Sequence, residues 1–191
     1  MYCVGGRLGV WVAPDTGWLS ALAALRVGET PALGVYRYMA SSIEEELRRL
    51  RTEAEKQLML GNVRGSARRP LKKIEGLAAS GTEDWAFALR YLAELEVEKH
   101  PWRAALRLQQ LRRSGWGDDS VDALFGLTQA ILGNFGAAAN AYRRAVQRAP
   151  RNAWYRHNLG HILDVAMNQP NLALEHLRVA ASLAPDEADI I

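Results

Sequence analysis

The sequence predicts an all-α protein built from stacked antiparallel helical hairpins, and two observations lead to that prediction. The first is a repeat, because segments 132–150 and 167–185 both carry small residues in the middle and end in proline. The second is periodicity, because apolar residues recur at helical intervals and no segment alternates long enough to form a strand. A repeated helical pair cannot bury its apolar face alone, so we expect the pairs to stack on one another.

The composition is that of an ordinary globular protein. Of the 191 residues, 49% are hydrophobic and 24% are charged, and the formal net charge is only +3. Attraction to nucleic acid or to a membrane surface would therefore need a local patch of charge. No apolar run approaches the roughly 20 residues that span a bilayer, so we expect no membrane insertion. The single cysteine, Cys3, cannot form an internal disulfide, and we expect a cytoplasmic protein.

Residues 1–38 differ from the rest of the chain in their few charges and frequent glycine. Met39 follows them, and Ser41 and Ser42 are each followed three residues later by glutamate, which is the pattern of a capping box at a helix N-terminus. Our hypothesis is that translation begins at Met39 and that residues 1–38 are a low-charge leader, non-native or poorly ordered. Residues 39–81 would then supply N-terminal helices and a basic linker.

Helical periodicity and stop signals place the individual helices. The first is expected over residues 43–60, where the heptad-like spacing is too short for a coiled coil and indicates a packing helix. Capping the repeats and forming a homodimer contact both remain open roles for this helix. Thr82 is a suitable N-cap for a later helix. The other helices are expected over residues 71–79, 83–99, 102–113, 120–132, 136–148, 153–166 and 170–183.

The last two helical pairs share matched positions. Gly126 and Gly160 lie 34 residues apart, and each follows a large apolar residue. Further matches join Ala138 with Ala173, Tyr142 with Leu177, Ala145 with Ala180 and Pro150 with Pro185. Because the prolines lie 35 residues apart, one residue is inserted in the last pair, and we place it near residues 167–171. This pattern resembles the tetratricopeptide repeat, a helical pair with a period of about 34 residues.

The resemblance implies repeat units at residues 119–152 and 153–186, followed by a tail at 187–191. A degenerate unit at 82–118 has Leu92 and Ala93 in its first helix and Ala105 in its second, but it lacks the closing proline. The family's hairpins stack into a short right-handed superhelix, and its small residues let the paired helices approach closely. Since about three repeats are usually needed for stability, we expect the helices from residue 43 onward to supply a cap.

The resemblance also places a ligand groove on the first helices of the units, where an apolar wall stands beside a polar one. The candidate groove residues are Ala123, Leu127, Ala130, Ile131, Trp154, His157, Asn158, His161 and Asp164. Asn158 stands where many peptide-binding members hold ligand backbone, although the basic residues of a full carboxylate clamp are not evident. These side chains could equally face a C-terminal helix or solvent. The implied function is non-catalytic: an adaptor, chaperone or assembly factor that binds a segment of another protein.

Other functions have weaker support in the sequence. His157, His161 and Asp164 share one helical face at the spacing i, i+4, i+7, but no further ligand completes a metal site, and no nucleophile motif or carboxylate pair accompanies them. We therefore predict no metal, no cofactor and no enzymatic activity. The alternative is an RNA-binding helical protein. It would use a basic cluster without interleaved aromatic residues, made of Arg64, Arg68, Arg69, Lys72 and Lys73.

Overall fold

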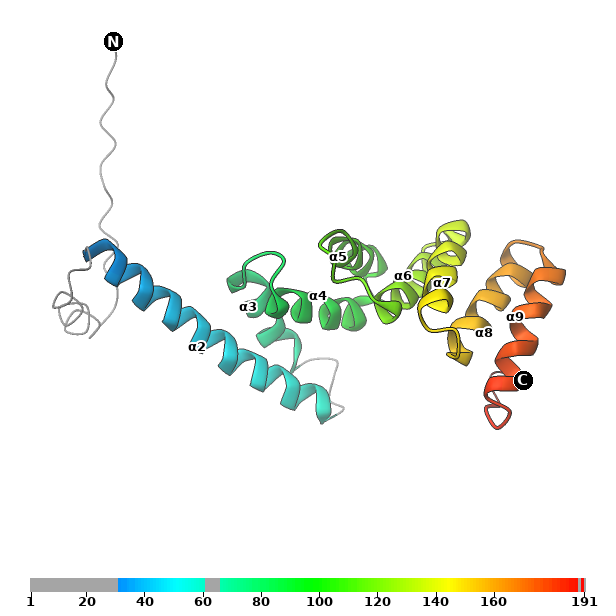
Figure 1. Ribbon diagram of the computed structural model, residues 1–191, viewed down its shortest axis with the longest axis horizontal. Helices are drawn as coiled ribbons and strands as arrows, with labels where there is room; N and C mark the ends of the chain where they lie inside the picture. The colour runs from blue at the N-terminus through cyan, green and yellow to red at the C-terminus, as the bar shows by residue number, and fades with distance from the viewer. Residues whose placement is uncertain (1–30, 61–65, 189, 191) are drawn as a thin grey trace, which may run out of the picture. The chain divides into compact units, whose positions relative to one another are not determined.

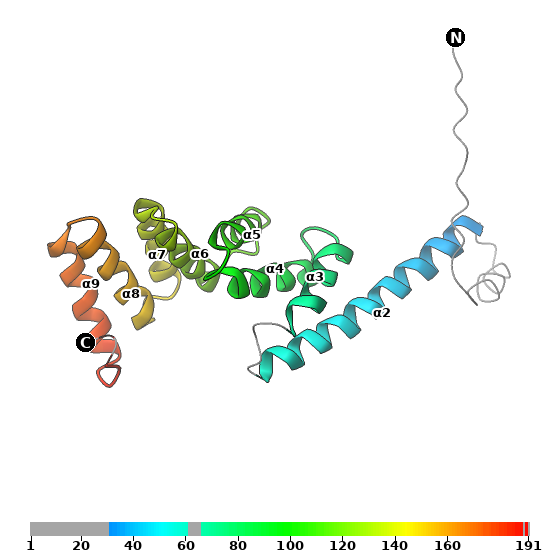
Figure 2. The ribbon, with the colours of Figure 1, turned by 180° about the vertical axis from the view of Figure 1, so that it is seen from behind.

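The computed structural model describes residues 31–60, 66–188 and 190, and all regular structure among them is helical. The helices are α2 Pro31–Met59, α3 Arg68–Leu77, α4 Glu83–Glu96, α5 Pro101–Arg113, α6 Asp119–Ile131, α7 Phe135–Arg148, α8 Ala153–His161 and α9 Pro170–Leu183. Figures 1 and 2 show that α3 to α9 lie beside one another in chain order. The chain divides into two units, residues 1–46 and residues 47–191. Among the described helices, none has both the length and the apolar composition that crossing a bilayer requires.

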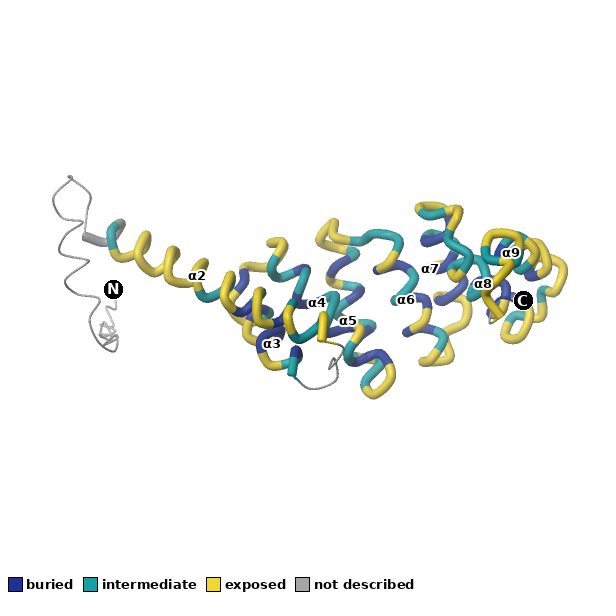
Figure 3. Tube along the Cα trace, turned by 90° about the horizontal axis from the view of Figure 1, so that it is seen from below, coloured by how far each residue is buried: buried dark blue, intermediate teal, exposed yellow. Residues whose placement is uncertain are grey.

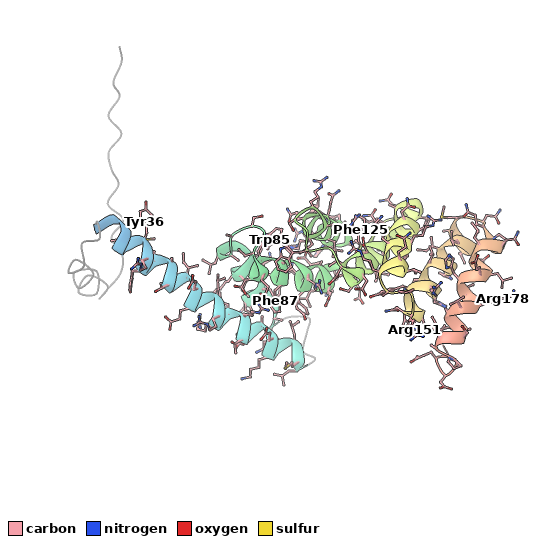
Figure 4. All side chains as sticks on the ribbon, in the orientation of Figure 1. Tyr36, Trp85, Phe87, Phe125, Arg151 and Arg178 are labelled. Carbon is pink, nitrogen blue, oxygen red and sulfur yellow. The ribbon has the colours of Figure 1, made fainter. Side chains whose placement is uncertain are left out.

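Helix α2 begins at Pro31 rather than near residue 43, so Ser41 and Ser42 lie inside the helix and form no capping box. Proline suits the first helical turn, because its missing N–H would have no partner within the helix there. Residues 35–45 are all exposed, and Tyr36, which Figure 4 labels on this helix, is 71% exposed. The predicted leader therefore includes the first turns of α2, while its residues 1–30 lie outside the described part of the chain.

The second half of α2 packs with α3 against the first hairpin. Leu50 and Ala54 of α2 are buried in one cluster with Leu71 and Ile74 of α3 and Leu92 of α4. Helix α3 begins at Arg68, three residues earlier than predicted, because a proline is tolerated in its first turn. These two helical segments cover the apolar side of α4, which is the capping role expected for them.

Three helical hairpins follow, formed by α4–α5, α6–α7 and α8–α9. The first helix of each begins at a side chain that accepts a backbone N–H hydrogen bond from the third residue after it. These N-caps are Thr82, Asp118 and Asn152, with donor–acceptor distances of 3.4, 2.8 and 3.2 Å. The prediction that Thr82 is an N-cap is thus confirmed. In Figure 3 the buried stretches of α4 to α7 lie within the hairpins and many exposed stretches lie at their loops.

Two glycines are required by the close approach of paired helices. A Cβ atom on Gly126 would lie 2.8 Å from Cδ2 of Tyr142, nearer than carbon atoms approach in real proteins. A Cβ on Gly160 would lie 2.7 Å from Cγ of Leu177 and 3.2 Å from the carbonyl oxygen of Ala173. The matched glycines therefore make room for the large residue that follows in the second helix of each hairpin.

The α4–α5 hairpin has the same construction with a different residue in its second helix. Ala93 of α4 and Ala104 of α5 are both fully buried, whereas Ala105, the predicted contact, is only half-buried. The prediction missed by one residue because it assumed the spacing of α6–α7, whereas the two small residues lie one residue closer in sequence here. The interval from the small residue of the first helix to the buried alanine of the second is 11 residues in α4–α5, 12 in α6–α7 and 13 in α8–α9.

The extra residue of the last hairpin lies within the first helix rather than in the loop after it. Residues Ile162–Ala166 form a π turn that continues α8, and the N–H of Met167 donates to the carbonyl of Ile162 at 3.1 Å, an i+5 to i bond. The loop of α6–α7 contains a residue in the left-handed backbone region, Gly133 at φ +76°. The loop after the π turn keeps this conformation at the matching position, where Asn168 has φ +52°. The inserted residue was predicted near residues 167–171, but the structure accommodates it at residues 162–166. A wider helical turn can absorb an insertion without lengthening the loop that follows.

Candidate functional site

The predicted apolar wall lies on α6, and its residues divide into two kinds. Leu127 and Ile131 are large side chains that stay 41% and 48% exposed. Ala123 and Ala130, in contrast, are partly buried against the core that α6, α7, α8 and α9 share. The two alanines hold neighbouring hairpins together, so only the two large residues offer an open apolar surface.

The predicted polar wall lies on α8 and contains a row of aromatic rings. Trp154, which is 44% exposed, meets His157 edge to face with ring centroids 6.1 Å apart. The rings of His157 and His161 stack with centroids 6.3 Å apart and planes only 4° from parallel. Among the described residues, the buried Nδ1 of His157 has no hydrogen-bond partner. The row therefore places three aromatic rings next to one another along α8.

Asp164 does not join the two histidines as predicted. The expected spacing assumed an ordinary α-helix, but Asp164 lies within the π turn. A π turn contains more residues than an ordinary helical turn, so the i, i+4, i+7 spacing no longer implies one shared face. Nowhere in the part of the chain that the structure describes do three metal-binding side chains gather. The π turn also leaves Val165 70% exposed, which adds an apolar residue near the end of the first helix.

Asn158 lies one residue beyond His157 on the same helix and is half-buried. Its backbone carbonyl receives the N–H of Ile162, but its side-chain amide makes no hydrogen bond within the described residues. A half-buried amide with unused donors and an unused acceptor is suited to bind the backbone of a peptide.

The structure also reveals a pocket on the first hairpin that the sequence analysis did not include. It has a volume of about 240 Å³. Its lining residues are Arg51, Glu83, Ala86, Phe87, Arg90, Tyr91, Leu111 and Trp116. The rings of Phe87 and Tyr91 meet edge to face at 4.8 Å, and the guanidinium of Arg51 stacks on Phe87 at the same distance. Aligning Ala93 with Gly126 would have predicted part of this lining, because that offset places Arg90 at the position of Ala123.

The predicted basic cluster is not assembled as a free patch. Arg68 pairs at 2.8 Å with the carboxylate of Glu96, which is only 1% exposed. Arg107 of α5 pairs with the same carboxylate and also lies 3.0 Å from Glu75 of α3. Arg68 therefore helps to join three helices. Arg69, Lys72 and Lys73 are exposed, and Arg64 lies outside the described residues.

Comparison with known proteins finds solved structures of similar fold. No protein-family model and no curated protein sequence matches the chain. A crystal structure of MamA matches with a TM-score of 0.64 at 20% identity over 74% of this chain and 75% of that one. A double mutant of MamA, "RS-1 ArsTM", matches with a TM-score of 0.65 at 17% identity over 76% and 79%.

A thermophilic tetratricopeptide repeat protein of Thermus thermophilus matches over more of the chain. Its TM-score is 0.56 at 19% identity, over 89% of this chain and 91% of that one. The helical pairs, their order and these likenesses agree with the predicted fold class of antiparallel hairpins in a short superhelix. The chain therefore has the stacked-hairpin fold of the tetratricopeptide repeat proteins.

Proposed function

We propose that this protein is a non-catalytic interaction module that captures a segment of another protein on the first helices of its hairpins, as an adaptor, chaperone or assembly factor. The observation that carries the proposal is the exposure of Leu127, Ile131 and Trp154 on α6 and α8, the first helices of the last two hairpins. Large apolar residues that remain in contact with water gain free energy when a partner covers them, at about 25 cal/mol per Å².

Polar groups beside these residues supply the selectivity of the proposed site. The unpaired amide of Asn158 can accept from and donate to a ligand backbone, which fixes the register of an extended segment. The rings of Trp154, His157 and His161 give the segment an aromatic surface against which to pack. In this arrangement the apolar residues provide most of the affinity, and the amide determines how the segment is aligned.

A pair of leucine substitutions tests the proposal. Leu127→Asp places a charge in the middle of the proposed face, whereas Leu106→Asp makes the same change on α5, where Leu106 is 54% exposed and belongs to a second helix. Both side chains are already in contact with water, so both variants should keep the helical circular dichroism of the parent chain. Partners recovered from native extract by the parent chain and by each variant are then compared by mass spectrometry.

We expect a protein that is lost with Leu127→Asp and retained with Leu106→Asp. Its binding segment can then be mapped with overlapping peptides. Asn158→Ala should lower the affinity of the chain for the mapped peptide. Equal recovery by the parent chain and both variants would contradict the assignment of this face. Loss with both variants would show that the partner recognises the general surface rather than the first helices.

A further inference from the structure

A second site emerges from the charges around Asp122, which lies in the first turns of α6 and is only 2% exposed at its side chain. Three guanidinium groups surround this one carboxylate. Nε of Arg112 lies 3.2 Å from Oδ1, Nε of Arg144 lies 2.9 Å from Oδ1, and Nε of Arg148 lies 3.6 Å from Oδ2. Arg112 comes from the last turn of α5 and the other two from α7, so the cluster joins three helices.

The charges in this cluster do not balance. Residues 101–163 contain nine arginines and no lysine, against three aspartates and no glutamate. The other two aspartates have partners elsewhere, since Asp118 pairs with Arg90 and Asp119 accepts a hydrogen bond from the hydroxyl of Tyr155 at 3.1 Å. Among the described residues, Asp122 is therefore the one carboxylate paired with these three arginines, and two positive charges are left over.

The same arginines keep hydrogen-bond donors free. All three approach Asp122 through Nε, and Arg148 also donates from Nη1 to the carbonyl of Gly117. Within the described residues, the Nη groups of Arg112 and Arg144 have no acceptor. Cζ of the Arg112 guanidinium lies over the ring of Phe125, 4.8 Å from its centroid, and this cation–π contact limits its motion (Phe125 is labelled in Figure 4).

The heads of the arginines are also reachable from solvent. Their side chains are 29%, 35% and 48% exposed for Arg112, Arg144 and Arg148, while Asp122 beneath them is not accessible. Burial and, after it, the like charge of Arg144 lower the pKa of Arg112, and the attraction of Asp122 does not reverse that shift. An anion from solvent would therefore bind to the exposed heads of the arginines while Asp122 stays paired with them from below.

We propose that Arg112, Arg144 and Arg148 bind a dianionic phosphate group, carried by a phosphorylated side chain of a protein segment or present as free phosphate. A phosphomonoester carries close to two negative charges at neutral pH, which matches the excess of two positive charges. It also presents several acceptor oxygens to the free Nη donors, and the planar fork of arginine fits such oxygens well. A single carboxylate would leave the cluster half neutralised.

This site uses side chains of α5 and α7, and none of them belongs to the proposed peptide-binding face on α6 and α8. Its test needs no captured protein, so it can fail while the proposed function holds, and the reverse is also true. The two sites would act together if one partner segment lay on the face and carried a phosphate near its end.

The test is calorimetric titration of the full chain with two probes at neutral pH and constant ionic strength, set with chloride. One probe is inorganic phosphate, and the other is a phosphoserine peptide flanked by alanines, with its unphosphorylated form as a blank. Arg144→Gln removes one charge from the site, and Arg143→Gln is the matched control, since Arg143 is its neighbour on α7 and bonds only to Asn140 among the described residues. Asp122→Asn increases the positive excess from two to three.

We expect the parent chain to bind, Arg144→Gln to bind about tenfold more weakly, a change of about 1.4 kcal/mol, and Arg143→Gln to bind like the parent. Asp122→Asn should bind several-fold more tightly, a gain that a purely structural role for the cluster would not produce. Should Arg144→Gln fail to fold, Arg148→Gln, which changes the most exposed of the three arginines, takes its place with the same expectation.

Tighter binding of the phosphopeptide than of inorganic phosphate assigns the site to phosphorylated protein, and equal binding assigns it to free phosphate. No binding of either probe, or equal loss in Arg144→Gln and Arg143→Gln, would overturn the proposal.

Discussion

Replacing Gly126 with alanine tests whether the close approach of α6 and α7 determines the stability of the hairpin. The new Cβ would lie 2.8, 2.9 and 3.1 Å from three ring carbons of Tyr142, whose side chain has little room to move because the residue is 2% exposed. Overpacking of this kind costs about 1–3 kcal/mol. Alanine recovers about 1 kcal/mol of helix propensity relative to glycine, so we expect a net loss of up to about 2 kcal/mol of unfolding free energy.

Gly76 is the matched control, because it lies in helix α3 and a Cβ there would meet nothing within 4 Å. Gly76→Ala should therefore raise the unfolding free energy by up to about 1 kcal/mol, so the two variants differ in sign. Urea unfolding followed by far-UV circular dichroism measures both changes. In a Tyr142→Ala background the obstacle is gone, and Gly126→Ala should become stabilising. If Gly126→Ala stabilised the parent chain as Gly76→Ala does, the account of the glycine would be refuted.

Three further predictions concern buried charge, pH and backbone conformation. Arg107→Met should lower the unfolding free energy by roughly 3 kcal/mol, because it leaves the buried carboxylate of Glu96 with one partner fewer; Glu96→Gln in the same urea assay should cost less. Burial alone would raise the pKa of Asp118, but a backbone amide and Arg90 outweigh it and hold the pKa below its ordinary value of 3.8. The stability from this group is present above that value and lost as pH falls through the lower folded pKa, so Asp118→Asn should flatten the acid limb of a stability-against-pH curve. Asn168→Gly should stabilise the chain by up to about 1 kcal/mol in thermal unfolding, because a residue at φ +52° is strained unless it is glycine; a lower melting temperature would contradict this.

The hairpins could be predicted from the sequence because their spacing is set by local contacts. Gly126 and Gly160 each face a large residue of the next helix, and that requirement repeats with the period of the fold. The π turn could be predicted only in part. The 35-residue interval between Pro150 and Pro185 shows that a residue was added, but the interval is the same whether a loop or a helical turn absorbs it.

The start of α2 and the charged clusters could not be predicted, for two different reasons. The pairs of serine and glutamate at residues 41–45 fit a capping box, but the same residues are compatible with the interior of a helix that has already begun. Asp122 and Glu96 are each paired with arginines from neighbouring helices. Periodicity within one helix contains no information about those partners, so the phosphate site and the role of Arg68 required coordinates.

The two buried carboxylates also affect the order in which the array opens. Glu96 links α3, α4 and α5, and Asp122 links α5, α6 and α7, so ion pairs connect each of these five helices to its neighbours. Among the described residues no ion pair joins α8 or α9 to an earlier helix. The hydroxyl of Tyr155 on α8 instead donates a hydrogen bond to the carboxylate of Asp119 on α6. The last hairpin is therefore held to the rest mainly by the apolar core that it shares with α6 and α7. We expect it to open before the rest, and hydrogen exchange should show its amides exchanging first. A partner that contacts both α6 and α8 would stabilise the contact between the last two hairpins, so binding and the folding of the final hairpin would be coupled.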